Sequence, residues 1–199
     1  MAKKKHRQLG YSPRKVDIKE IRQRFLIVCE GQKTEPNYFR SFRVPKVVID
    51  VQGLGINPTG LVDRAKELRS QGEYDQIWCV FDRDSWTEQD FCFAIKSAND
   101  EGIRIAYSNE SFELWYILHF EFLDTGVSRS DYLRKLTALL GYQYSKNSES
   151  IYDELLSKQQ KAIRNAENLL NQYSPCNPVK DNPSTTVHLL VLELNKFIR

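Results

Sequence analysis

The sequence predicts an α/β fold, a mainly parallel sheet flanked by helices, with a C-terminal helical extension. Strand-like apolar runs alternate with helical patterns from residue 24 to residue 122, which is typical of successive strand–helix–strand units. The first run, FLIVC, lacks polar alternation, as expected for a parallel strand buried on both faces. After residue 131 the strand signals end, and leucines recur at helical spacing.

The first unit is predicted as a strand over residues 24–30, a short turn, and a helix over residues 35–42. Thr34 is expected to cap this helix, because a threonine hydroxyl can accept a hydrogen bond from a free N–H group of the first turn. Glu35 and Pro36 suit the first turn itself, where acidic residues and proline are favoured.

The same pattern then repeats three times. Each strand is a short run rich in Val, Ile and aromatic residues, and each helix has apolar residues three or four positions apart. Gly72 and Gly102 are expected to end the first two of these helices. The predicted strands cover residues 46–51, 74–81 and 103–107, and the helices cover residues 61–71, 91–101 and 111–122.

The C-terminal part is predicted to be helical, with helices over residues 133–140 and 151–173. Asn182 and Pro183 are expected to cap and open a last helix. The chain therefore divides into a basic arm, an α/β core and a helical extension packed on the core, at residues 1–24, 25–125 and 126–199.

The amino-acid composition favours a globular protein without a membrane-spanning segment. The 199 residues, 41% of them hydrophobic, can form a packed core, and no apolar run approaches the roughly 18 residues that a membrane span needs. The N-terminus has no apolar segment of a secretory signal, so a cytoplasmic protein without a membrane partner is expected. The four cysteines form no CxxC pair and are interpreted as reduced core residues rather than zinc ligands.

Charge is distributed unevenly along the chain. Residues 1–24 contain nine Lys or Arg and two acidic residues, a net charge of +7, which leaves −4 for the remainder. A cationic arm suits a polyanion such as nucleic acid, because Lys and Arg contacts release counterions from phosphates. A solvated tail is the alternative interpretation.

Acidic residues follow two of the predicted strands. Glu30 ends the first strand, and the third ends with Asp82 and Asp84. The side chains of these two aspartates point to the same face of an extended chain, because they are two positions apart. Ligands bind at the carboxyl ends of strands in open α/β sheets, and crowded carboxylates favour a hard cation such as Mg²⁺ or Mn²⁺. Glu113 lies in the apolar segment SNESFELWYILHF and needs a cation, a salt bridge or a proton. The alternative roles are helix capping or loop solvation for the acids at the strand ends, and a structural salt bridge for Glu113.

Further residues are candidates for binding phosphate or nucleic acid. Lys33 precedes a predicted helix N-terminus, and Asn109 opens the segment after the fourth strand. Lys158, Lys161 and Arg164 are spaced three apart and can form one basic helix face. A surface lysine and an ordinary solvated helix face are the competing interpretations.

Two resemblances follow from these motifs. Glu30 with Gly31, and Asp82-Arg83-Asp84, resemble the Toprim domain of topoisomerases, primases and old-type nucleases, a Rossmannoid fold. A more specific resemblance, over almost the whole chain, is to the RloB-like family of bacterial defence proteins. It is carried by IVCEGQKTEPNYF, VFDRD, SNESFELWYILHF, KAIRNAENL and NPSTTVHLLVLEL. The chain departs from the SNPxFELW pattern by having Glu110 at the proline position.

The resemblance implies a Toprim-like core, a role in antiviral abortive defence and an AAA-type ATPase partner. It assigns the Toprim glutamate to Glu30 and the two aspartates to Asp82 and Asp84, with Glu113 nearby. The resulting hypothesis is metal-dependent cleavage of DNA or of RNA, tRNA included, with Glu113 completing the site or acting as general base. A non-catalytic subunit of an ATPase complex and a phosphatase or nucleotide-processing enzyme are the alternatives. Self-association into a homo-oligomer is compatible with either role.

Overall fold

The computed structural model describes residues 23–44, 47–83 and 86–198 of the chain. Its centre is a five-stranded sheet in the order β2-β1-β3-β4-β5, in which β5 alone is antiparallel to its neighbour. The predicted mainly parallel α/β fold is therefore confirmed. The strands are β1 (Gln23–Cys29), β2 (Val47–Gly53), β3 (Gln76–Asp82), β4 (Arg104–Asn109) and β5 (Ser184–Thr185).

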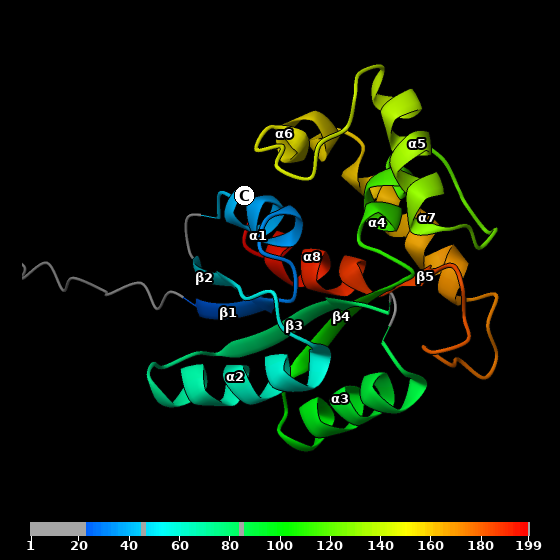
Figure 1. Cartoon of the computed structure of the whole chain (residues 1–199). Helices are drawn as coiled ribbons and strands as arrows, with labels where there is room; N and C mark the ends of the chain where they lie inside the picture. The colour runs from blue at the N-terminus through cyan, green and yellow to red at the C-terminus, as the bar shows by residue number, and fades with distance from the viewer. Residues whose placement is uncertain (1–22, 45–46, 84–85, 199) are drawn as a thin grey trace, which may run out of the picture.

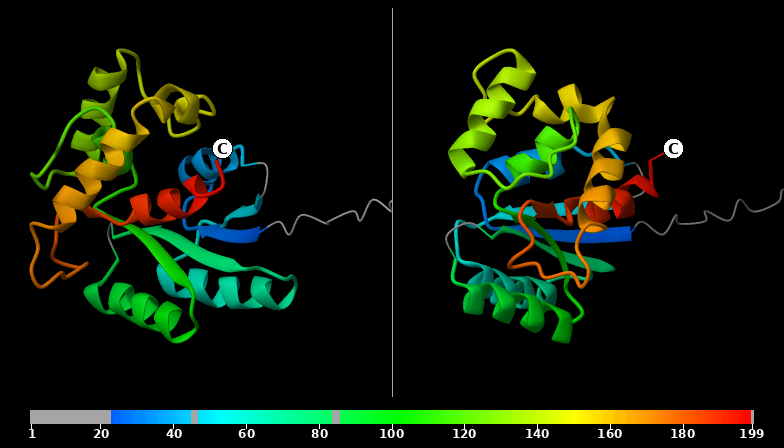
Figure 2. Two further views of the ribbon diagram at one scale, coloured as in Figure 1. Left: turned by 180° about the vertical axis from the view of Figure 1, so that it is seen from behind. Right: turned by 90° about the vertical axis from the view of Figure 1, so that its right-hand side faces the viewer.

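Helices cover both faces of the sheet. Figure 1 shows α2 and α3 below it, α1 and α8 above it, and the remaining helices stacked over this upper layer; Figure 2 shows the same layers from behind and from the side. The helices are α1 (Thr34–Arg40), α2 (Pro58–Ser70), α3 (Glu88–Asp100), α4 (Glu113–Leu118), α5 (Arg129–Leu140), α6 (Ile151–Leu156), α7 (Gln159–Leu170) and α8 (Val187–Asn195).

β1 is buried on both faces, as its continuous apolar sequence predicts. Successive side chains of a strand point to opposite sides, and Phe25 and Ile27 pack into the cluster above the sheet, whereas Leu26 and Val28 pack below it against α2 and α3. All four side chains are fully buried. β1 can therefore occupy only an inner position, between β2 and β3.

Three local predictions are wrong. α1 is capped by Lys33 without a side-chain hydrogen bond, and the Thr34 hydroxyl instead donates to the Lys146 carbonyl at 3.3 Å. The expected single helix over residues 151–173 is divided into α6 and α7 at Ser157 and Lys158, where the sequence has neither Gly nor Pro to mark a break. α4 is also shorter than the predicted helix over residues 111–122.

The start of the last helix also differs from the prediction. α8 begins at Val187, because Ser184 and Thr185 first pair with the edge of β4 as the short strand β5. The Thr185 hydroxyl also donates to the Tyr107 carbonyl at 3.0 Å. Asn182 therefore does not cap the helix, and the sheet gains a strand from the C-terminal part of the chain.

The C-terminal helices share their core with the α/β part. Tyr132 and Leu136 of α5, and Leu190 of α8, belong to the same buried cluster as Tyr38 and Trp115. The predicted division at residue 125 stays a prediction, and residues 1–22 of the predicted arm lie outside the described residues. No helix within the described ranges combines the length and apolarity that crossing a bilayer requires.

We predict that α8 is stabilised through one face only. Leu190 is fully buried, whereas the neighbouring Leu189 is 43% exposed. Leu190→Ala should lower the free energy of unfolding by about 2–5 kcal/mol, because it removes apolar contacts and leaves a cavity. Leu189→Ala should cost less than about 1 kcal/mol. Urea unfolding of the two variants measures both values, and equal losses would contradict the described packing of α8.

Candidate functional site

The site lies where the strand order reverses. The chain passes from β1 to β2 on one side, whereas β3 pairs with β1 on the other, so the carboxyl ends of β1 and β3 form a switch point at which ligands bind in open α/β sheets. Glu30 follows β1 and Asp82 ends β3. The two acids that the sequence places at strand ends are therefore brought together.

Glu30 is held in place by two donors. Its Oε2 accepts a hydrogen bond from the Asp82 backbone N–H at 3.0 Å, and its Oε1 accepts one from the Trp86 indole N–H at 2.8 Å. Its own backbone N–H donates to the Val80 carbonyl at 2.8 Å and extends the β1–β3 pairing by one step. The Glu30 carboxylate thus links the end of β1 to the loop after β3.

Asp82 faces the helices above the sheet. Alternate β3 residues Trp78 and Val80 pack into the cluster on that face, and Asp82 continues the alternation. Asp82 is 5% exposed. The guanidinium of Arg129, at the start of α5, lies 3.8 Å from its Oδ2.

Glu35 is a site residue that the sequence analysis assigned only to a helix turn. It lies at the second position of α1 and is 5% exposed, and its carboxyl group rests over Gly31. A Cβ at Gly31 would lie 2.0 Å from Glu35 Oε2, so glycine permits this close approach. The signal that could have identified Glu35 is its position in a helix that starts directly after a central strand, because that first turn returns to the same sheet edge.

Glu113 enters the site from a fourth segment. It is the first residue of α4 and is 1% exposed. Its Oε1 lies 3.3 Å from the Lys146 ammonium, but makes no hydrogen bond within the described part of the chain. The Asn109–Glu110 peptide that precedes α4, at the departure from the SNPxFELW pattern, is cis.

These four acids, Glu30, Glu35, Asp82 and Glu113, form what we call the carboxylate cluster. It borders two adjoining pockets. The larger has a volume of about 490 Å³ and is lined by Glu35, Asp82, Glu113 and Lys146 among others, and the smaller, of about 210 Å³, by Glu30, Glu35, Asp82 and Trp86. Arg129 lines both pockets. The cluster therefore extends from Glu30 on one side to Glu113 on the other.

Burial and mutual repulsion raise the pKa values of two acids in this cluster. Burial raises the pKa of Asp82 well above its usual range, and the neighbouring Glu35, Glu113 and Glu30 raise it further, against the opposing effect of Arg129. Burial raises the pKa of Glu35 to about 7, with further contributions from Glu113 and Glu30. Such perturbed carboxyl groups in a pocket are typical of catalytic or cation-binding sites.

The side chains of the cluster suit a hard divalent cation, because all four are carboxylates. Within the described ranges, however, no three Asp, Glu, His or Cys side chains are already grouped to hold one metal ion. Asp84, the other predicted ligand, lies outside the described residues. The carboxylates thus have the chemistry that magnesium or manganese prefers. Binding one ion would require further ligands, or a shift of these side chains toward a common point.

The other predicted binding residues lie in three places. Lys33 is exposed and lines the larger pocket. Asn109 is buried, and its amide donates to the carbonyls of residues 178, 179 and 181, so it holds that loop rather than facing the pocket. Lys158, Lys161 and Arg164 are exposed, and the first two contact Phe120 beyond the C-terminal end of α4, away from Glu113.

We predict that Glu35→Gln stabilises the metal-free protein above pH 7. Because the pKa of Glu35 is about 7 in the folded state and lower when unfolded, the folded state binds more protons, and its stability falls as the pH rises from about 4.5 to 7. A neutral amide removes this loss, worth on the order of 3 kcal/mol. Urea unfolding in EDTA at pH 8 and pH 4.5 measures the difference.

The matched control for this prediction is Glu67→Gln. Glu67 pairs with Arg64 on the surface of α2, 2.6 Å apart, so its replacement should change stability by less than about 1 kcal/mol at either pH. A Glu35→Gln variant that gains no more at pH 8 than at pH 4.5 would show that repulsion within the carboxylate cluster is not a significant cost.

Comparison with known protein families identifies the family of this chain. The family model described as RloB-like protein matches residues 25–194, nearly the whole chain. No curated protein and no solved structure matches the chain significantly. The matched range runs from within β1 to within α8 and includes all four members of the carboxylate cluster. The chain therefore belongs to the RloB-like family.

Proposed function

We propose that this protein is a metal-dependent nuclease that cleaves phosphodiester bonds in RNA or DNA. The observation that carries the proposal is the gathering of four carboxylates, three of them buried, around two adjoining pockets at the switch point of the sheet. Buried acids that repel each other are costly unless a cation or a proton compensates them. A function in which a cation binds there accounts for the presence of these acids side by side.

In this proposal Glu30, Asp82 and Asp84 hold one or two Mg²⁺ or Mn²⁺ ions, the roles that the Toprim resemblance implies. Bound at this site, the metal would supply Lewis-acid polarisation of the phosphate and a more acidic water. The hydrogen bonds from Asp82 N–H and Trp86 Nε1 fix the Glu30 carboxylate before any ligand binds. This preorganisation limits the rearrangement that ligand binding requires.

Glu35 and Glu113 are proposed to serve proton transfer or to complete the ligand set. With a pKa of about 7, Glu35 is able to accept a proton at neutral pH, which suits a general base. Glu113 is almost fully buried and lies in the same pocket. The burial of these two acids limits solvent access to that side of the site.

The biological role proposed is antiviral abortive defence, with an AAA-type ATPase as the partner that restrains or activates cleavage. Membership of the RloB-like family supports this context. Control by a partner is chemically reasonable, because an unrestrained nuclease would damage the cell that makes it. The binding-subunit alternative shares the ATPase partner but predicts no turnover.

We predict that Asp82→Asn and Glu30→Gln each reduce cleavage by at least roughly 100-fold. Both changes keep the shape of the side chain but remove the charge that a cation requires. Labelled tRNA, single-stranded RNA, plasmid DNA and nucleotides, each with Mg²⁺, Mn²⁺ or EDTA, test the reaction and distinguish a nuclease from a nucleotide-processing enzyme. Asp63→Asn, which removes a surface carboxylate paired with Lys66, is the matched control and should retain full activity.

Two outcomes would contradict this proposal. One is full cleavage by folded Asp82→Asn in EDTA, which would show that the reaction requires neither the metal nor the Asp82 carboxylate. The other is the absence of cleavage by the wild type both alone and with an added AAA-type ATPase partner, which would favour the non-catalytic subunit. Circular dichroism of each variant confirms that lost activity is not lost folding.

We also predict that Mg²⁺ or Mn²⁺ raises the melting temperature of the wild type and not that of Asp82→Asn. A ligand that binds only the folded state stabilises it, by about 2.7 kcal/mol at 100 times its Kd. Calorimetry with the divalent cation, against KCl of the same ionic strength, measures the shift. Equal shifts in the two proteins would place cation binding away from Asp82.

A further inference from the structure

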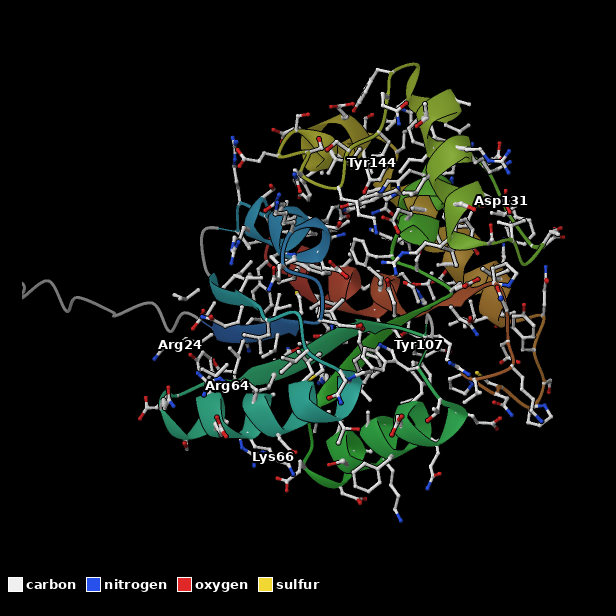
Figure 3. The ribbon with its side chains drawn as sticks, in the orientation of Figure 1. Arg24, Arg64, Lys66, Tyr107, Asp131 and Tyr144 are labelled. Atoms are coloured by element: carbon white, nitrogen blue, oxygen red, sulfur yellow. The ribbon has the colours of Figure 1, made fainter. Side chains whose placement is uncertain are left out.

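Lys146 lies on a loop whose backbone is held in place at two points. The Thr34 hydroxyl donates to the Lys146 carbonyl at 3.3 Å, and the Tyr144 N–H donates to Thr137 Oγ1 at 3.1 Å. Tyr144 is buried, with its ring 6.2 Å from that of Tyr116 in an edge-to-face contact. Figure 3 shows Tyr144 among the helices above the sheet. The loop therefore positions Lys146 over the pocket.

The Lys146 ammonium is only partly engaged. It lies 3.3 Å from Glu113 Oε1, yet this oxygen has no hydrogen bond in the described part of the chain. The Glu113 side chain is 2% exposed, whereas that of Lys146 is 40% exposed and lines the larger pocket. An ammonium group has three donors, so this one retains donors that can reach a ligand in the pocket.

The cationic groups of the site come from outside the strands. Arg129 begins α5, directly after Ser128, which forms a reciprocal capping box with Asp131. Arg129 borders both pockets together with Asp82, whereas Lys146 borders only the larger one. Lys146 thus lies at the Glu113 end of the carboxylate cluster, and a bound anion there would lie between a lysine and the acids.

We propose that Lys146 binds a phosphate group of the nucleic-acid substrate directly, at the Glu113 end of the pocket. This inference rests on the proposed function and adds a substrate-binding residue to it. A purely structural role, neutralising Glu113, would favour a closed ion pair with directed hydrogen bonds. The observed pair instead has a partly exposed ammonium and a carboxylate oxygen without a hydrogen bond.

The test separates phosphate binding from neutralisation of Glu113. Removing Lys146 alone would leave a buried carboxylate unpaired, so the comparison is made between Glu113→Gln and the double variant Glu113→Gln/Lys146→Met. Binding of labelled single-stranded RNA and of labelled single-stranded DNA is measured by fluorescence anisotropy in EDTA, over a range of salt concentrations. Lys135→Met in the Glu113→Gln background is the matched control, because Lys135 pairs with Glu121, 2.6 Å away, and borders neither pocket.

If Lys146 contacts a phosphate, the double variant should bind roughly tenfold more weakly than Glu113→Gln. Its slope of log affinity against log salt should be smaller by about 0.7, the value for one lost contact to a single strand. Glu113→Gln/Lys146→Arg should retain most of the affinity, and the Lys135 control should match Glu113→Gln.

Equal affinities and equal salt slopes for Glu113→Gln and its Lys146→Met double variant would overturn the inference, because Lys146 would then act only on Glu113. That outcome leaves the proposed nuclease intact, since the metal-dependent activity is measured separately. A wild type that binds neither RNA nor DNA and also cleaves neither with Mg²⁺ or Mn²⁺ would remove the proposed function and this inference together. Melting temperatures of all variants show whether each remains folded.

Discussion

Burying Glu35, Asp82 and Glu113 beside Glu30 has a free-energy cost, because each carboxylate loses water and faces like charge. The surrounding elements of the site are arranged to limit this cost. Glu30 accepts two hydrogen bonds, Arg129 lies near Asp82, and Lys146 lies near Glu113. The raised pKa values of Asp82 and Glu35 indicate that compensation within the protein is incomplete. This residual repulsion is what a bound cation would relieve.

The sheet makes this concentration of charge feasible. β1 and β3 are packed on both faces, so their carboxyl ends are held at a fixed separation, with Glu30 N–H hydrogen-bonded to the Val80 carbonyl. Formation of the sheet alone therefore brings Glu30 and Asp82 together. The helices above the sheet then close the site from one side; α5 contributes Arg129, and the loop between α5 and α6 contributes Lys146.

The parts of this structure that could be predicted from the sequence are those with a strong local pattern. The continuous apolar run of β1 fixed its position, and placement at strand ends identified Glu30 and Asp82. β5 was missed because two residues carry no recognisable alternation, and its pairing depends on β4, far away in the sequence. The break between α6 and α7 was also missed, because the helical spacing of apolar residues continues across it and no Gly or Pro marks it.

The two cations that lie beside Asp82 and Glu113 were missed for a related reason. Arg129 lies 47 positions after Asp82, and Lys146 lies 33 positions after Glu113, so only tertiary packing brings each pair together. Glu35 was placed in the correct helix turn, but its local interpretation as a first-turn acid concealed its approach to the other carboxylates. Lys158 and Lys161, by contrast, had a clear periodic pattern and contact Phe120, beyond the other end of α4.

The hydrogen bond from Trp86 to Glu30 gives the site an intrinsic optical property. Trp78 and Trp115, the other two tryptophans, are 3% and 0% exposed and lie in the core, whereas Trp86 is half-buried and borders the smaller pocket. The indole emission depends on the polarity and hydrogen bonding of its surroundings, and that of Trp86 is coupled to the Glu30 carboxylate at 2.8 Å. The protein thus carries its own fluorophore at the carboxylate cluster, and occupancy of the site is open to observation without any added label.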